Sequence, residues 1–181
     1  MKAILKEILS TSIYLLCVLL VTFLIVNFVG QRTQVVGSSM ESTLSDGDNL
    51  IVDKITYRFK DPERYDIIVL IAEGNNVWGQ QYVKRIIGLP GETVQIDDEG
   101  NIFIDGEQLD ESYGKEVMLE AGRASEPITL QDDEYFVLGD NRNDSSDSRM
   151  EAVGNIKRDD IIGRAWVRIY PFDSIGVLKH Q

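Results

Sequence analysis

ILSTSIYLLCVLLVTFLIVNFVGQ, residues Ile8 to Gln31, is an uncharged and mostly apolar stretch near the N-terminus. Its roughly two dozen residues, at about 1.5 Å each, form a helix long enough to cross a hydrocarbon core of about 30 Å. A soluble core helix of this length would normally carry a polar face, and none occurs between Ile13 and Val26. The stretch therefore predicts one transmembrane helix ahead of the rest of the chain.

The residues around this stretch favour an uncleaved anchor. Its exit, Val26 to Gln31, has bulky residues where a cleaved secretory signal would have a small-x-small pattern. Lys2 and Lys6 precede the stretch and only Arg32 follows it closely, so the positive-inside rule puts the N-terminus in the cytoplasm. We expect a single-pass protein of the cell membrane with three parts: a cytoplasmic segment 1–7, a transmembrane anchor 8–31 and an extracytoplasmic domain 32–181.

The composition of the chain excludes several classes of partner and site. The formal net charge is -12, which argues against nucleic acid as a partner because phosphate neutralisation needs clustered Lys and Arg. An acidic domain would also be repelled by anionic lipid, so we expect the helix and apolar contacts to hold it at the bilayer. The sole cysteine, Cys17, lies inside the apolar stretch, so the following domain has no disulfide, thiol nucleophile or cysteine metal site.

Histidine usage is equally restrictive. The sole histidine, His180, is the penultimate residue, and chain termini are poor places for a catalytic base. A Ser-His-Asp triad and a histidine-ligated zinc site are both disfavoured, and we expect neither a metal nor a cofactor. If a serine acts as nucleophile, a carboxylate or a buried lysine must take its proton.

The domain after the anchor reads as mainly β. Short apolar and β-branched stretches recur between turn signals such as Asp46-Gly47-Asp48 and Leu89-Pro90-Gly91. We expect antiparallel β-sheets, with a hairpin and a small inserted cap at 93–134. The expected strands lie at Leu50–Tyr57, Asp66–Ala72, Gln81–Ile87, Thr93–Ile96, Ile102–Ile104, Tyr135–Leu138 and Ile161–Tyr170.

Two residues could together form a nucleophile and its base. Ser39, in Gly37-Ser38-Ser39-Met40, follows the anchor closely. Lys84 lies on a predicted strand, and the alternation of side chains gives it Tyr82 and Ile86 as neighbours on one face, a setting that removes water from an ammonium. Each residue taken alone is explained more simply, Ser39 as a turn residue and Lys84 as a lysine that reaches out to water.

A third polar segment, Gly139 to Arg149, follows the predicted strand at Tyr135–Leu138. Together the segments closely resemble the bacterial type I signal peptidases, which are membrane-anchored serine proteases. That family has an N-terminal anchor followed by segments like G-x-S-M-x-P-T-L, R-G-D-I-V-V, K-R-x-x-G-L-P-G-D and G-D-N-R-x-x-S-x-D-S-R. This chain has, in the same order, Gly37-Ser38-Ser39-Met40-Glu41-Ser42-Thr43-Leu44, Arg64-Tyr65-Asp66-Ile67-Ile68-Val69, Lys84-Arg85-Ile86-Ile87-Gly88-Leu89-Pro90-Gly91-Glu92 and Gly139-Asp140-Asn141-Arg142-Asn143-Asp144-Ser145-Ser146-Asp147-Ser148-Arg149.

The resemblance implies a Ser-Lys dyad that removes signal peptides from exported preproteins, acting as a monomer without a cofactor. It makes domain 32–181 the catalytic domain, Ser39 the nucleophile, Lys84 the general base and Ser145 the residue that hydrogen-bonds and orients Lys84. Met40 matches a residue beside the substrate cleft. The positions that hold the shape of the site through ion pairs are Asp140, Arg142, Asp147 and Arg149.

The chain departs from the family pattern at four positions. Ser42 replaces the usual proline, Tyr65 replaces glycine, and Met150 replaces a common aromatic residue. Gly37 stands where some members have a serine that donates to the oxyanion, so a second oxyanion donor is not identified. None of these changes removes Ser39, Lys84 or Ser145, and we expect activity.

Competing functions have less support. Ser112-Tyr113-Gly114-Lys115 matches the S-x-x-K of penicillin-binding proteins, but no S-D-N or K-T-G follows it. No G-x-S-x-G surrounds Ser39, which argues against an α/β-hydrolase. Self-cleaving repressor proteases use a related dyad but are soluble and carry a DNA-binding region. The alternative from another class is a specialised or non-catalytic relative that serves a narrow set of exported proteins such as pilins.

Overall fold

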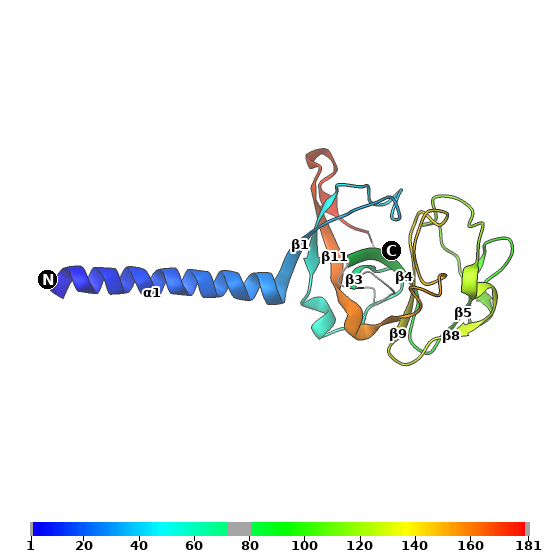
Figure 1. Ribbon diagram of the computed structural model, residues 1–181, viewed down its shortest axis with the longest axis horizontal. Helices are drawn as coiled ribbons and strands as arrows, with labels where there is room; N and C mark the ends of the chain where they lie inside the picture. The colour runs from blue at the N-terminus through cyan, green and yellow to red at the C-terminus, as the bar shows by residue number, and fades with distance from the viewer. Residues whose placement is uncertain (1, 72–80, 180–181) are drawn as a thin grey trace.

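The computed structural model describes residues 2–71 and 81–179. Helix α1 (Lys2–Leu24) continues through a π-helical turn, η1 (Ile25–Val29), directly into strand β1 (Gly30–Gln34). Figure 1 shows this helix projecting away from the rest of the protein. Its window Lys6–Val29 has a mean hydropathy of 2.6 and none of it is buried, so this helix could span a membrane.

The expected anchor, 8–31, does not coincide with a single element of the structure. The helix begins at Lys2, and Gly30 and Gln31, which we expected inside the anchor, belong to β1. There they pair with Asp53 and Val52 of the next strand. The sequence criterion was an uncharged, mostly apolar stretch, and Gly30 and Gln31 are uncharged whether they are helical or in a strand. Such a criterion cannot locate the change from helix to strand.

The main sheet is antiparallel throughout and confirms the predicted fold class. Its strands run in the order β1-β2-β11-β3-β4-β9-β10, and β12 pairs with β11. They are β2 (Asn49–Asp53), β3 (Ile67–Ile71), β4 (Gln81–Gly88), β9 (Glu134–Leu138), β10 (Ile156–Lys157), β11 (Ile161–Tyr170) and β12 (Gly176–Val177). The turn predicted at Glu73–Asn76, the expected strand end at Ala72 and His180 lie outside the described residues.

A second sheet of four short strands lies within residues 93–129, far from α1 in Figure 1. Its order is β7-β6-β5-β8, with β5 (Thr93–Ile96), β6 (Ile102–Ile104), β7 (Glu107–Gln108) and β8 (Ile128–Thr129). Val94 and Ile96 from this sheet share a buried cluster with Phe136 and Leu138 of β9. The two sheets are thus joined through a common core.

Four 3₁₀ turns complete the described structure: η2 (Thr56–Arg58), η3 (Gly122–Ser125), η4 (Arg158–Asp160) and η5 (Phe172–Ser174). The first of them corrects one expected strand, Leu50–Tyr57, which ends at Asp53. The Asp53 carboxylate accepts hydrogen bonds from the backbone N–H groups of Ile55 and Thr56 and so starts η2. Side-chain capping of this kind competes with continuation of a strand.

Strand β4, which carries Lys84, lies inside the main sheet. It is bonded to β3 on one side and to β9 on the other, and its residues from Val83 onward are all buried. The register pairs Lys84 with Ile68 of β3. Lys84 is therefore buried, with 3% of its surface exposed.

Candidate active site

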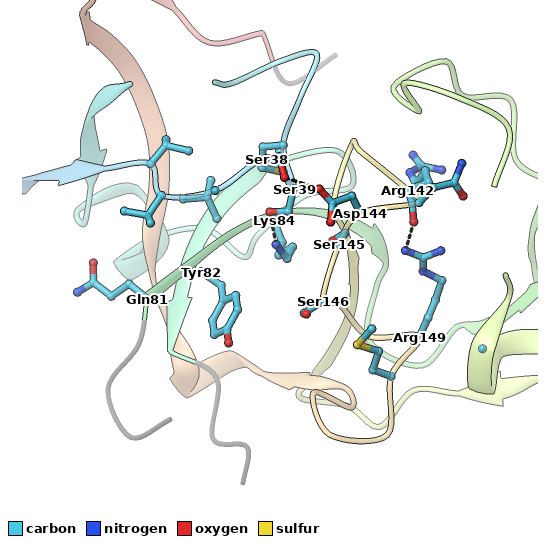
Figure 2. A pocket seen from close by; sticks show the side chains of 18 of the residues that line it. Ser38, Ser39, Gln81, Tyr82, Lys84, Arg142, Asp144, Ser145, Ser146 and Arg149 are labelled. Carbon is cyan, nitrogen blue, oxygen red and sulfur yellow. Dashed lines mark hydrogen bonds between the residues drawn. The ribbon is translucent and has the colours of Figure 1, made fainter. Parts of the chain in front are cut away.

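Ser39 and Lys84 meet at the centre of a cleft. Lys84 Nζ donates a hydrogen bond to Ser39 Oγ at 2.6 Å, although the two residues are 45 positions apart (Figure 2). The loop that carries Ser39 is fixed by its own backbone: Asn141 N–H donates to Ser39 C=O at 3.0 Å, and Asn141 Nδ2 donates to Ser38 C=O at 3.2 Å. The loop Gly37–Leu44 and the segment after β9 are therefore held together at Ser39.

The surroundings of Lys84 favour its neutral form. The residue is only 3% exposed, and its ammonium lies 5.5 Å from the centre of the Tyr82 ring, the neighbour predicted by strand alternation. Burial lowers the pKa of Lys84 from 10.5 to about 8, against the carboxylates of Asp147 and Asp140, which raise it. A substantial fraction of the amine is therefore unprotonated slightly above neutral pH.

Asp140 is neutralised by a residue that the sequence analysis did not single out. Arg85 donates from Nε to Asp140 Oδ1 at 2.8 Å and from Nη2 to Oδ2 at 2.7 Å. Thr43 Oγ1 also donates to Asp140 Oδ2. The Tyr113 ring lies with its centre 3.8 Å from the Arg85 guanidinium carbon and shields this ion pair. The only sequence signal for Arg85 was its place beside Lys84 in a family motif.

Asp147 is neutralised by Arg149, two residues further along the same segment. Arg149 donates from Nε to Asp147 Oδ1 at 2.8 Å and from Nη2 to Oδ2 at 2.9 Å. Arg142 does not pair with Asp140; its Nη1 donates to Glu111 Oε1 at 2.7 Å, and its Nε donates to Gly139 C=O at 3.0 Å. Glu111 lies in an acidic stretch without a clear pattern, so nothing in the sequence marked it.

Ser145 lies beside the dyad but does not make the contact that the resemblance implies. Its Oγ is buried and has no hydrogen-bond partner among the described residues, so the expected bond to Lys84 is not formed in this structure. Figure 2 shows Ser145 next to Lys84 and Asp144. A Cβ added to Gly139 would come within 2.2 Å of Ser145 Oγ and 2.4 Å of Ser39 C=O, which shows how closely these segments approach. The orienting role of Ser145 stays a prediction.

The cleft around the dyad has a volume of about 530 Å³. In Figure 2, Gln81 and Tyr82 lie on one side of Ser39 and Lys84, and Arg142, Ser146 and Arg149 lie on the other. Met40 is among the residues that line the cleft, while its side chain is 1% exposed and belongs to the core. Residues on both sides of Ser39 line the cleft, an arrangement that suits an extended chain attacked near its middle.

Two residues that depart from the family pattern, Tyr65 and Gly37, have positive φ angles. Tyr65 has φ +71°, the left-handed region that glycine enters without strain. Gly37 has φ +91°, and its N–H donates to Asp46 Oδ1 at 2.8 Å. Next to it, Ser38 Oγ donates to Asp144 Oδ2 at 2.5 Å. Ser38 and Asp144 both line the cleft and were not selected by the sequence analysis.

A buried lysine in contact with a serine hydroxyl provides a base and a nucleophile for acyl transfer. The described residues contain no group of three or more His, Cys, Asp or Glu side chains arranged to hold a metal ion. The cleft brings a serine hydroxyl and a buried amine into contact, beside two buried ion pairs.

Comparison with known proteins gives consistent matches. The model of the family "Signal peptidase, peptidase S26" matches residues 6–170. Probable signal peptidase I-2 of Synechocystis sp. is 41% identical over 157 residues, covering 83% of this chain and 68% of the relative. Signal peptidase I T of Bacillus subtilis is 35% identical over 167 residues, covering 88% of this chain and 84% of the relative. A crystallised signal peptidase I from Enterococcus faecalis is 36% identical with a TM-score of 0.46, covering 58% of this chain and 97% of that chain.

Proposed function

Because the chain belongs to the signal peptidase family, peptidase S26, we propose that Ser39 and Lys84 are the catalytic dyad with which it removes signal peptides from preproteins. It is a serine-type peptidase. The observation that carries the assignment of the dyad is the 2.6 Å contact between Lys84 Nζ and Ser39 Oγ, made by a lysine that is almost wholly buried.

The mechanism follows from the protonation state of Lys84. Neutral Lys84 takes the Ser39 proton as Oγ attacks the carbonyl carbon of the scissile bond. The backbone N–H of Ser39 contributes to stabilising the oxyanion. The Lys84 ammonium then protonates the leaving amine, which is the N-terminus of the mature protein. Water activated by Lys84 hydrolyses the acyl-enzyme and releases the signal peptide.

The ion pairs of the Gly139–Arg149 segment support this mechanism by cancelling charge. Uncompensated carboxylates at Asp140 and Asp147 would stabilise the ammonium and raise the pKa of Lys84. Arg85 and Arg149 each bind one of these carboxylates through two hydrogen bonds. Asp140, Asp147 and Arg149 therefore act on the electrostatics of the base as well as on the shape of the site, and Arg142 ties the segment to Glu111.

The location of the site at a membrane follows from the helix that precedes it. We assign α1 to a single transmembrane anchor with its N-terminus in the cytoplasm, because Lys2 and Lys6 precede the apolar stretch. The catalytic domain, 32–181, then lies outside the cytoplasm and acts as a monomer. A preprotein held in the same bilayer would present its cleavage site as an extended strand, with small side chains such as alanine entering the cleft beside Met40.

A cleavage assay with a preprotein that carries an A-x-A exit tests this function. The detergent-solubilised full chain is incubated with the preprotein and the cut is mapped by mass spectrometry, beside Lys84→Ala and the control Lys157→Ala, which alters an exposed lysine on β10. We expect a cut directly after A-x-A by the wild type and the control and none by Lys84→Ala. A cut that survives Lys84→Ala would show that Lys84 is not the base, and failure of the wild type would favour a narrow-substrate or non-catalytic relative.

A further inference from the structure

A short basic turn, residues 54–60, lies directly against the end of the anchor. Lys54 N–H donates to Val29 C=O at 3.0 Å, and Lys54 Nζ donates to Gln31 Oε1 at 3.1 Å. The Arg58 guanidinium carbon lies 5.1 Å from the centre of the Phe28 ring, on the last turn of the helical segment. In Figure 1 the basic turn is the teal segment beside the junction of α1 and β1. Because it contacts the end of the anchor directly, the basic turn lies where the domain meets the bilayer surface.

The basic turn has a fixed conformation. Asp53 accepts hydrogen bonds from Ile55 N–H at 2.8 Å and from Thr56 N–H at 3.1 Å. Tyr57 is the inward-facing residue: it is 8% exposed, and its hydroxyl donates to Asp66 Oδ2 at 2.6 Å. Arg158 donates to Tyr57 C=O from the other side. With Tyr57 directed inward, the residues that follow it face solvent.

Those outward residues combine positive charge with an exposed aromatic ring. Arg58 and Lys60 are exposed, and Phe59 between them is 83% exposed. Lys54, Arg58 and Lys60 take part in no ion pair within the parts of the chain that the structure describes, and residues 54–60 contain no carboxylate. In a chain of net charge -12, residues 54–60 carry three positive charges and no negative one, between Asp53 and Asp61, where the domain meets the anchor.

We propose that the basic turn binds the anionic lipid headgroups around the anchor, with Arg58 and Lys60 on the phosphates and Phe59 entering the interface. The proposal rests on the membrane anchoring assigned to α1. Cations held at a lipid surface gain roughly fivefold each in binding to anionic membranes, and apolar rings settle at the headgroup level. The acidic charge elsewhere in the domain would then be held off the surface while the turn is held on it. This contact would fix the direction in which the Ser39 cleft faces the bilayer.

A fluorescence experiment on the full chain in vesicles tests the proposal. An environment-sensitive dye is attached to Ile55→Cys in a Cys17→Ser background, since Cys17 is the sole native cysteine and Ile55 is a partly exposed residue of the turn. Vesicles of phosphatidylcholine alone are compared with vesicles that also contain phosphatidylglycerol. We expect a blue shift only with phosphatidylglycerol, reversed by high salt because screening shortens the range of the attraction.

Variants distinguish an effect of the basic turn from an effect of the net charge of the protein. Arg58→Gln/Lys60→Gln should weaken the response to phosphatidylglycerol. At about fivefold for each cation, the equilibrium constant for contact between the turn and the headgroups should fall about 25-fold. The control Lys157→Gln/Lys179→Gln makes the same change in net charge at exposed lysines elsewhere and should keep the response. Asp61→Asn removes the carboxylate that follows Lys60 and should strengthen it.

The outcomes distinguish this proposal from the membrane anchoring on which it rests. Protein that floats with the vesicles but gives the same emission in both lipid mixtures would overturn the proposal alone. Equal loss of the response in the control pair would overturn it as well, because the effect would then follow net charge. Protein that does not float with vesicles at all would overturn both the anchor and the lipid contact of the basic turn.

Discussion

Arg85 and Asp140 form an ion pair with two hydrogen bonds, and their side chains are 1% and 0% exposed. Arg85 is the residue that follows Lys84 in β4. Removing one partner of a buried pair leaves an uncompensated charge and typically costs about 3–5 kcal/mol. The pair also has an electrostatic effect on its neighbour. The Asp140 carboxylate raises the pKa of Lys84. The Arg85 guanidinium bound to that carboxylate carries the opposite charge.

Replacing Arg85 should therefore lower the stability of the fold and raise the pKa of Lys84. For Arg85→Gln we expect a loss of about 3–5 kcal/mol in the free energy of unfolding by urea, and a pH dependence of cleavage displaced to higher pH. Arg64→Gln is the control, since it breaks the more exposed Arg64–Glu92 pair. It should cost less stability and leave the pH dependence in place. An unshifted pH dependence in Arg85→Gln would contradict the electrostatic role.

Burial of Lys84 should lower the stability of the folded protein at neutral pH. With a pKa of 10.5 when unfolded and about 8 when folded, the unfolded chain binds more protons between these values, so wild-type stability rises with pH across this window. Lys84→Met, which removes the ionisable amine, should be inactive yet more stable by about 3 kcal/mol at pH 7. The difference should disappear above about pH 10.5. Equal stability of the two proteins at pH 7 would contradict the lowered pKa.

The close approach of Gly139 to the dyad predicts a sharp effect of one methyl group. In Gly139→Ala the new Cβ would meet Ser145 Oγ at 2.2 Å and Ser39 C=O at 2.4 Å, so the loop that carries Ser39 must move. We expect loss of most cleavage activity in a protein that still unfolds cooperatively. Gly176→Ala is the matched control, because its Cβ would have no neighbour within 4 Å. Full activity of Gly139→Ala would show that Ser39 does not depend on this approach.

The left-handed backbone at Tyr65 can be tested with a pair of truncations. Both Tyr65→Gly and Tyr65→Ala remove the ring, which lies 5.1 Å from the Tyr113 ring. Only alanine keeps the strain of φ +71°, so Tyr65→Ala should be less stable than Tyr65→Gly by about 1 kcal/mol in thermal or urea unfolding. Equal stabilities would mean that the backbone changes conformation once the ring is gone.

Much of the fold could be predicted because local patterns decide it. The alternation that places Tyr82 and Ile86 beside Lys84 is a property of any strand, and the turn signals limit the strands on either side. Strand β1 was not predicted, since Gly30 and Gln31 continue an uncharged stretch and acquire their strand structure only by pairing with β2. The limits of the inserted cap remain a prediction.

The charge partners in the site could not be predicted from local pattern. Arg85 and Asp140 are 55 positions apart, and Arg142 and Glu111 are 31 positions apart. Segment order identified the acids and arginines, but only the tertiary fold decides which acid meets which arginine. Ser145 illustrates the same limit, because the family motif identifies the residue while the hydrogen bond of its Oγ depends on the packing around Gly139.

The pH dependence of kcat/KM for cleavage of an A-x-A peptide tests the central claim most directly. If neutral Lys84 is the base for Ser39, kcat/KM should rise about tenfold per pH unit below pH 8 and level off above it, because the amine loses its proton with a pKa of about 8. A profile that is flat through pH 8, or that falls as the pH rises through this value, would contradict a Ser39–Lys84 dyad.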